Sequence, residues 1–250
     1  MAIAREWDGA GYDRVSTQME VMGREVLDRL PLRGDETVLD SGCGSGRVTA
    51  ALIERLPRGR VIGVDGSESM IAAARRRLGP AIDLRVADLV GLDLGERVDA
   101  VLSTATFHWI GDHDALFASL RANLRGGGRL VAQCGGIGNV RNIHAAAREA
   151  AAEAPFDQHL AGWRGPWNFA TPQVTEARLR AAGFAEARCR LEPRPVTPEA
   201  PAAYLTTIVL GAHLERLPTE LHERFVAATQ ARLPVPLTID YVRLNIDARA

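Results

Sequence analysis

The chain has 250 residues, with 30 Lys+Arg and 31 Asp+Glu, a formal net charge of −1 and 46% apolar residues. This length and composition are typical of a globular protein with one full hydrophobic core. The balanced charge argues against a protein that coats nucleic acid, and no apolar run reaches the roughly 20 residues that span a bilayer. The polar beginning lacks the pattern of a secretory signal, and three scattered cysteines fit a reducing compartment, so we expect a cytoplasmic protein.

The first half of the chain alternates short apolar runs with segments of helical periodicity. We expect strands at residues 37–40, 60–65, 82–86, 98–103 and 129–134. We expect helices between them at residues 47–56, 67–78 and 114–124. This alternation predicts right-handed crossovers and a parallel sheet covered on both faces, a doubly wound α/β fold. Such sheets bind ligands beyond the carboxyl ends of their strands.

The second half has a different pattern. Helices are expected at residues 143–152, 172–182, 198–210 and 218–231, with an irregular, Trp-containing segment at 156–169. Strands are expected at residues 185–191 and 237–246. A late pair of strands added to a parallel core predicts a mixed, mostly parallel sheet of seven strands.

The most informative segment is a glycine-rich turn that follows the first strand. Asp40 precedes Gly42, Gly44 and Gly46, and the next strand ends in Asp65. Glycine lets the backbone approach a ligand closely, and a carboxylate at the second strand end can accept both hydroxyls of a ribose. The spacing is G-x-G-x-G rather than the dinucleotide pattern G-x-G-x-x-G, and a preceding carboxylate does not suit a pyrophosphate. We therefore favour a cationic nucleoside such as S-adenosylmethionine over NAD.

Five segments in order resemble the motifs of class I S-adenosylmethionine-dependent methyltransferases. They cover roughly residues 36–136 and read VLDSGCGSG, VIGVDGSESMI, VADLVGLDL, VDAVLSTATFHWIGD and GGGRLVAQCGG. The segments FHWIGD and GGIGNV, with a later Trp-containing stretch before TPQVTEARLRAAGF, resemble the trans-aconitate methyltransferase-like branch. This resemblance implies a Rossmann-like fold with a helical cap, S-adenosyl-L-methionine as cofactor, and O-methylation of a small-molecule carboxylate.

The resemblance also implies roles for residues of the turn. Gly42, Cys43 and Gly44 match the backbone under the methionine part of the cofactor. Asp40 matches the acidic residue that organises the turn, and Asp65 matches the carboxylate that binds the ribose hydroxyls.

Further cofactor contacts are implied along the next two strands. Gly66 and Met70 match residues beside the adenine, and Asp88 matches the acidic residue that faces its amino group, with Leu89 next to it. Ser103 and Thr104 end the fourth strand, where the family's backbone approaches the methionine ammonium. The branch often has Asn at the position of Thr104, so the resemblance implies no side-chain contact there.

The resemblance implies one domain over residues 1–250. It divides into an N-terminal helical lid at 1–30, a cofactor-binding core at 31–136, substrate-cap elements and a late strand at 137–236, and a final strand at 237–250. In the lid, Tyr12 and Gln18 match residues that can reach the cofactor carboxylate.

His108 is the candidate catalytic base, because it follows the fourth strand where the methyl group is expected. A structural histidine packed on Trp109 is an equal alternative. Candidate substrate-binding residues lie on the same rim or in the cap: Trp109, Asn139, Arg141, Trp163, Trp167 and Tyr204. Arg141 could clamp a carboxylate bidentately, or be a solvated arginine at a helix start. Trp163, Trp167 and Tyr204 could wall the pocket or simply form the core of the cap.

Several alternatives stay open from the sequence. The chain could methylate nitrogen or carbon of a secondary metabolite, or be a non-catalytic cofactor-binding relative. An enzyme acting on nucleic acid or protein is disfavoured, because a basic face and an Asn/Asp-Pro-Pro-aromatic loop are absent and residues 103–106 read STAT. We expect a small-molecule substrate, no nucleic acid, no membrane, no metal, and a monomer or homodimer.

Overall fold

The computed structural model describes the backbone of residues 17–250 and the side chains from Met19 onward. Its centre is one sheet of seven strands: β1 (Thr37–Ser41), β2 (Arg60–Asp65), β3 (Asp83–Val86), β4 (Val98–Thr104), β5 (Leu124–Gly135), β6 (Glu186–Pro193) and β7 (Val242–Arg249). The strand order is β3-β2-β1-β4-β5-β7-β6. The first five strands are parallel, and β7 pairs antiparallel with both β5 and β6. The predicted doubly wound, mostly parallel α/β fold with seven strands is confirmed.

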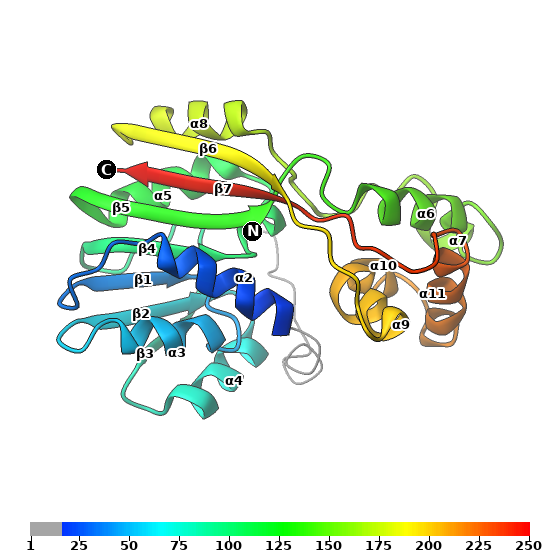
Figure 1. The fold of residues 1–250 in the computed structure, drawn as a ribbon, viewed down its shortest axis with the longest axis horizontal. Coiled ribbons are helices and arrows are strands. Elements are labelled where there is room, and N and C mark those ends of the chain that lie inside the picture. Colours follow the sequence, from blue (N-terminus) through cyan, green and yellow to red (C-terminus); the bar gives the residue numbers. More distant parts are fainter. Residues whose placement is uncertain (1–16) are drawn as a thin grey trace.

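Helices cover both faces of this sheet (Figure 1). On one face lie α2 (Thr17–Asp28), α3 (Arg47–Glu54) and α4 (Glu68–Leu78), and on the other α5 (His113–Asn123) and α8 (Pro172–Ala181). Alternate residues of β1 explain this layering, since Val38 packs in the cluster under α2 and α3 while Leu39 packs in the cluster under α5. Both side chains are 0% exposed, so the strand is buried on both faces.

A group of short helices forms the cap beyond the carboxyl ends of the parallel strands (Figure 1). It contains α6 (Arg141–Ala151), α7 (Asp157–Leu160), α9 (Pro201–Tyr204), a π-helical turn (Leu205–Val209), α10 (Gly211–Leu214), a 3-10 turn (Thr219–Leu221) and α11 (His222–Gln230). The cap has its own hydrophobic cluster, which includes Ile143, Leu205 and Phe225, each fully buried. Met22 of α2 joins this cluster, so the cap also packs against the first described helix.

Two predicted elements of the second half differ from the structure. The last strand begins at Val242 and not at Leu237, because the amide of Tyr241 donates to Ile239 O and bends the chain there. Ile239 forms only an isolated bridge with Val196. The expected helix at 198–210 is also interrupted, because the amide of Leu210 donates to Leu205 O in a π-type turn.

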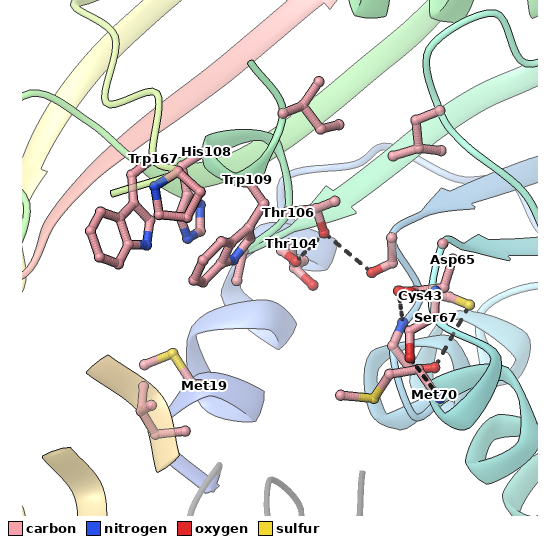
Figure 2. Close-up of a pocket in the computed structure, with 18 of the residues that line it drawn as sticks. Met19, Cys43, Asp65, Ser67, Met70, Thr104, Thr106, His108, Trp109 and Trp167 are labelled. Atoms are coloured by element: carbon pink, nitrogen blue, oxygen red, sulfur yellow. Dashed lines mark hydrogen bonds between the residues drawn. The ribbon is translucent and has the colours of Figure 1, made fainter. Parts of the chain in front are cut away.

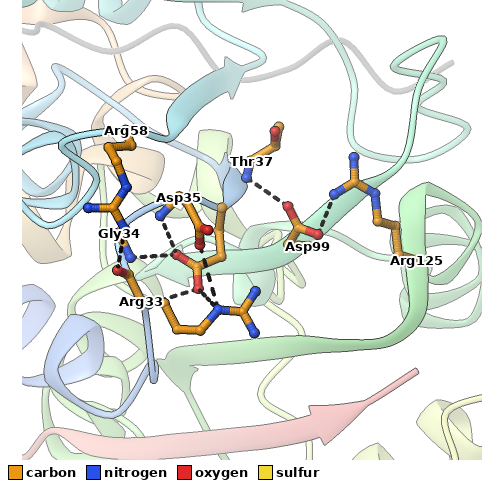
Figure 3. Close-up of polar contacts among 8 residues, drawn as sticks. Arg33, Gly34, Asp35, Thr37, Arg58, Asp99 and Arg125 are labelled. Atoms are coloured by element: carbon orange, nitrogen blue, oxygen red, sulfur yellow. Dashed lines mark hydrogen bonds and ion pairs between the residues drawn. The ribbon is translucent and has the colours of Figure 1, made fainter.

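Polar contacts hold the amino end of the sheet, away from the cap (Figure 3). The buried carboxylate of Glu36 accepts hydrogen bonds from the amides of Arg33 and Gly34, at 2.8 and 2.9 Å. Asp99 of β4 accepts from the amide of Thr37 at 2.8 Å and pairs with Arg125. These bonds fix the start of β1 against β4.

None of the helices within residues 17–250 combines the length and hydropathy needed to cross a bilayer.

Candidate active site

A cavity of about 1220 Å³ lies between the carboxyl ends of the parallel strands and the cap. Small-molecule sites usually have volumes of roughly 300–1,000 Å³, so this space can hold a nucleoside and an acceptor together. In Figure 2, Asp65, Ser67 and Met70 lie at one end of the cavity and the aromatic side chains of His108 and Trp167 at the other. The cavity therefore has a polar, acidic end and an aromatic end.

The glycine-rich turn forms the floor of the acidic end. The amides of Gly42 and Cys43 both donate to Val64 O, at 2.8 and 3.0 Å, which ties the turn to β2. A Cβ on Gly42 would lie 2.1 Å from Oγ1 of Thr106, so only glycine fits there. Gly44 has φ +53° and a Cβ at this position would meet nothing within 4 Å, because its backbone faces the cavity. The turn thus leaves its surface open for a ligand.

Asp65 links this turn to α4. One carboxylate oxygen accepts from the amide of Gly44 and the other from the amide of Ser67, both at 2.9 Å (Figure 2). These two bonds fix the orientation of a carboxylate that lines the cavity. A carboxylate at the end of the second strand can accept two neighbouring ribose hydroxyls.

Asp40 lies beneath the turn and is 1% exposed. Asp40 was predicted among the cofactor-binding residues, but it does not line the cavity. The structure therefore gives it no direct contact with a ligand in the cavity. Its Oδ2 accepts from Thr49 Oγ1 at 2.7 Å, while its buried Oδ1 has no hydrogen-bond partner among the described residues. Burial, opposed by the Thr49 bond and assisted by the charge of Asp65, raises the pKa of Asp40 to about 6. An unsatisfied carboxylate behind an open backbone turn fits a cationic nucleoside.

The other predicted cofactor residues divide into two groups. Gly66, Met70, Asp88 and Leu89 all line the acidic end, as does Thr104 at the end of β4. Cys43 also lines it, and burial together with the charges of Asp40 and Asp65 raises the pKa of its thiol, so it is no thiolate nucleophile.

Ser103 does not line the cavity. Successive residues of a strand point to opposite faces of the sheet, so Ser103 points away from the side of Thr104. Its hydroxyl donates to Ser41 O at 2.6 Å and joins β4 to β1. The predicted contact from Tyr12 and from the side chain of Gln18 lies outside the described residues. Met19 and Glu20 of α2 do line the cavity, so the helix that contains Gln18 reaches it.

His108 lies on the cavity wall directly after β4 and is 7% exposed. Burial, and to a smaller extent the charges of Arg243 and His113, keeps its pKa well below the ordinary 6.5. The amide of Gly135 donates to Nδ1 of His108 at 3.2 Å, so the single proton of the neutral ring is on Nε2. With Nδ1 accepting and Nε2 protonated, the ring has no free lone pair for a substrate proton. This geometry argues against the predicted base and makes His108 a hydrogen-bond donor.

The predicted substrate residues are only partly brought together. Trp109, Asn139 and Trp167 line the cavity. Arg141 is exposed at the first residue of α6 and does not line it, so it is the solvated arginine of the alternative interpretation. Trp163 does not line the cavity, contrary to its predicted place on the wall, and packs against Trp167 and the cap cluster, with the two Trp ring centroids 5.8 Å apart.

Tyr204 is a correction to the predicted pocket wall. It is 4% exposed, and its hydroxyl is hydrogen-bonded to that of Tyr241 at 3.0 Å within the cap. Tyr204 belongs to the hydrophobic cluster of the cap and does not line the cavity, as the alternative interpretation had it.

Arg243 lines the aromatic end and is 3% exposed, although its sequence position was not predicted to lie in the site. It lies on β7, where polar residues alternate with apolar ones and would ordinarily indicate a solvated face. The strand β7 instead lies inside the sheet, between β5 and β6. Its polar face is covered in part by Arg29, the residue after α2, which hydrogen-bonds Asn245. The usable signal was an arginine at the beginning of the last strand, close to the carboxyl edge of the sheet.

Comparisons with known proteins agree with this geometry. Residues 38–128 match the family model described as a methyltransferase domain. A trans-aconitate 2-methyltransferase of Variovorax paradoxus is 30% identical over 253 residues, covering 96% of this chain and 94% of that protein. One of Azoarcus sp. is 39% identical over 127 residues, covering 51% of this chain and 50% of that relative. The match thus spans only about half the length of several curated relatives.

The solved structures extend the comparison to the fold. The YcgJ protein of Bacillus subtilis aligns with a TM-score of 0.62 at 15% identity, covering 92% of this chain and 97% of that one. At this identity the likeness concerns the fold alone. The match to the Variovorax protein over nearly its whole length shows that the chain belongs to the trans-aconitate methyltransferase branch of the S-adenosylmethionine-dependent methyltransferases.

Proposed function

We propose that this protein transfers the methyl group of S-adenosylmethionine to a carboxylate oxygen of a small acid. The observation that carries the proposal is the tautomer of neutral His108 at the acceptor end of the cavity. Its Nδ1 accepts the Gly135 amide, so its one proton is on Nε2. A phenol or an amine benefits from a base, whereas a carboxylate is already ionised at neutral pH. The Nε2–H of His108 provides a donor for such an oxygen, and relatives of the chain are named for trans-aconitate, itself an acid.

The residues of the acidic end would hold the cofactor. Asp65 would accept the ribose hydroxyls, the backbone of Gly44 would pass close to the ligand, and Met70 and Leu89 would pack on the adenine. When bound, S-adenosylmethionine would supply the methyl group: the acceptor oxygen bonds to the methyl carbon while the bond between that carbon and sulfur breaks, and the electron pair of the broken bond remains on sulfur. No proton has to be removed from a carboxylate. The chain's part is to hold the acceptor in line and to exclude water.

The test is a two-stage measurement with the whole chain. Calorimetry with S-adenosylmethionine and S-adenosylhomocysteine measures cofactor affinity, and a screen of carboxylic acids with a labelled methyl group then detects transfer. A methyl ester is released by mild alkali, whereas N-methyl and C-methyl products survive it. Alkali-labile label on an acid is the expected result. Alkali-stable label on the true substrate, or cofactor binding with no transfer to any acid, would contradict the proposal.

A further inference from the structure

We infer that Arg243, His108 and Asn139 form the binding site for the acceptor's carboxylate, and that the acceptor is a monocarboxylic acid with an apolar or aromatic body. This inference rests on the proposed function and names its substrate class. It follows from the donors at one end of the cavity, from the charge that they lack, and from the aromatic walls around them.

Arg243 is a buried cation without a buried anion. Its Nε donates to Oε1 of Gln133 at 3.3 Å, and its guanidinium lies 5.5 Å from the ring centroid of Tyr241. Within residues 19–250 no carboxylate forms an ion pair with it, and no hydrogen bond from its Nη atoms is found. A charge at 3% exposure normally has a partner of opposite sign, because desolvation is costly otherwise. Since Arg243 lines the cavity, an anionic ligand there can be that partner.

Two neutral side chains around Arg243 are also fixed as donors. The amide of Gly135 occupies Nδ1 of His108, which leaves Nε2–H. The amide of Val242 donates to Oδ1 of Asn139 at 3.0 Å, so the Asn139 amide cannot be reversed and presents its NH₂ group. Both residues line the cavity and are buried. The remaining polar atoms of all three side chains are donors, which suits a carboxylate.

Gly135 shows that the three donors are neighbours. It pairs in register with Arg243 across β5 and β7, and its amide contacts His108. A Cβ at Gly135 would lie 2.8 Å from Nδ2 of Asn139 and 2.7 Å from the ring of Phe169. The absence of a side chain at this position therefore leaves room for the cluster at the end of β5.

The walls beside this cluster are aromatic. Trp167 stacks near Phe169, with ring centroids 6.3 Å apart and planes at 10°, and lies 4.2 Å from the ring of His144. Burial, and then the charge of Arg148, lowers the pKa of His144 to about 4, so this ring is neutral at pH 7. Trp109 closes the group at 6.0 Å from Trp167. Such surfaces bind apolar or conjugated carbon and do not solvate charge.

The charges of the described part of the cavity lining favour an acceptor with one carboxylate. Its cationic side chains are Arg47 and Arg243. Arg47 is already paired with Glu20 at 2.8 Å, at the cofactor end. A tricarboxylate such as trans-aconitate would place two further charges against aromatic walls, and each would lose its water without gaining a cation. A monoacid avoids this penalty. Its methyl ester no longer carries the charge that Arg243 binds, which favours product release.

The experiment measures the binding of acids to the protein saturated with S-adenosylhomocysteine. The probes are trans-cinnamate, phenylacetate and octanoate, with trans-cinnamamide as the uncharged counterpart of the first. Wild-type protein is expected to bind cinnamate on the order of 100-fold more tightly than cinnamamide, because charge-assisted hydrogen bonds are lost in the amide. Arg243→Met is expected to abolish this preference while S-adenosylhomocysteine affinity stays within about twofold.

Two further variants keep the result interpretable. Arg141→Met removes an exposed arginine and the same charge, and is expected to bind cinnamate as the wild type does. Arg243→Lys keeps a cation in a different shape and is expected to retain part of the preference, even if the Met variant folds poorly. Equal losses in Arg141→Met and Arg243→Met would overturn the inference, as would saturable binding of none of the three monoacids to the wild type.

The outcomes separate this inference from the proposed function. If an acid is methylated but Arg243→Met and Arg243→Lys both leave its KM unchanged, the proposed function holds and the inference fails. If monoacids bind through Arg243 but no alkali-labile label appears, the proposed function fails and the anion site stands. A higher kcat/KM for trans-aconitate than for every monoacid would overturn the assignment of substrate class.

Discussion

Glu36 and Asp40 are buried carboxylates at opposite ends of β1, and their environments differ. Glu36 precedes the strand and accepts hydrogen bonds from the amides of Arg33, Gly34 and Asp35. Burial raises the pKa of Glu36, but the backbone bonds and the charge of Arg33 outweigh it, and the pKa lies below 4.5. Asp40 keeps one bond and an unsatisfied oxygen, and its pKa is raised.

This contrast applies to the two ends of the whole sheet. At the amino end, buried charges are satisfied by the protein itself, so they stabilise the fold (Figure 3). At the carboxyl end, the chain leaves Asp40 and Arg243 incompletely paired beside a large cavity. Unsatisfied buried polar groups are rare in folded proteins and call for an explanation. For Arg243, which lines the cavity, we propose a bound anion as the explanation. The contrast predicts that substitutions reaching into the cavity at the carboxyl end impair binding, whereas substitutions at the amino end impair stability.

Asp65→Asn offers the severest challenge to this contrast. We expect affinity for S-adenosylhomocysteine to fall at least about 100-fold, because charge-assisted bonds to both ribose hydroxyls are lost. Either orientation of the new amide also turns its NH₂ group toward the amide of Gly44 or of Ser67. Calorimetry below the melting transition measures the affinity. Asp93→Asn, which removes the same charge from an exposed loop residue, is the control. Equal affinities of the two variants would refute the role of Asp65.

Two glycines of the same turn separate binding from folding. Gly44→Ala places a methyl group in the open cavity, so we expect roughly tenfold weaker cofactor binding and a stability loss of only about 1 kcal/mol from the left-handed backbone. Gly42→Ala collides with Thr106 and is expected to destabilise the fold by several kcal/mol. Thermal melts and titrations of both variants measure this. A stable Gly42→Ala protein together with full cofactor affinity in Gly44→Ala would contradict the packing role of Gly42 and the binding role of Gly44.

Glu36→Gln and Asp40→Asn sharpen the contrast through pH. The stabilising effect of Glu36 is present above its unfolded pKa and is lost as pH falls through its lower folded value. Glu36→Gln should therefore lose about 2 kcal/mol near pH 7 and less below pH 4. Asp40 has a raised pKa of about 6, so its protonated form stabilises at low pH and this benefit disappears as pH rises through 6. Asp40→Asn should gain up to about 3 kcal/mol above pH 6 and nothing near pH 4. Urea unfolding between pH 4 and pH 8 distinguishes the two; parallel curves would contradict the contrast.

The smallest expected effect is a flat pH profile. Because His108 stays neutral and donates through Nε2, kcat should change by less than about twofold between pH 6 and pH 9. His108→Gln, which keeps a donor, should retain more activity than His108→Leu, and neither should loosen cofactor binding. A rise in kcat with a pKa near 6.5 that His108→Gln removes would restore the base interpretation.

Sequence reasoning reached the cofactor half of the site because its signals are local. Residues of a strand, a turn and the next strand lie within a short stretch, so Gly42, Gly44 and Asp65 could be placed from their order alone. The acceptor half depends on pairing between distant segments. Arg243 reaches the cavity only because β7 inserts between β5 and β6. Arg141 is exposed to solvent although it begins the first helix after β5.

Which nitrogen of the neutral His108 ring carries the proton could not be predicted from the sequence either. It depends on the amide of Gly135 at the end of β5, a contact made only when β4 and β5 lie side by side. For Tyr204 the sequence left open both the cavity wall and the core of the cap, and the structure places it in that core, hydrogen-bonded to Tyr241.

The position of β7 has a consequence for how such a protein can change over time. The nucleoside half of the cavity is encoded within residues 42–90, and the acceptor half draws mostly on residues 104–112 and 139–243. Recombination that exchanges residues 139–243 between relatives would change the acceptor half of the cavity and leave the nucleoside half unaltered. One scaffold can thus diversify its products while its demand on the cell's methyl donor stays constant.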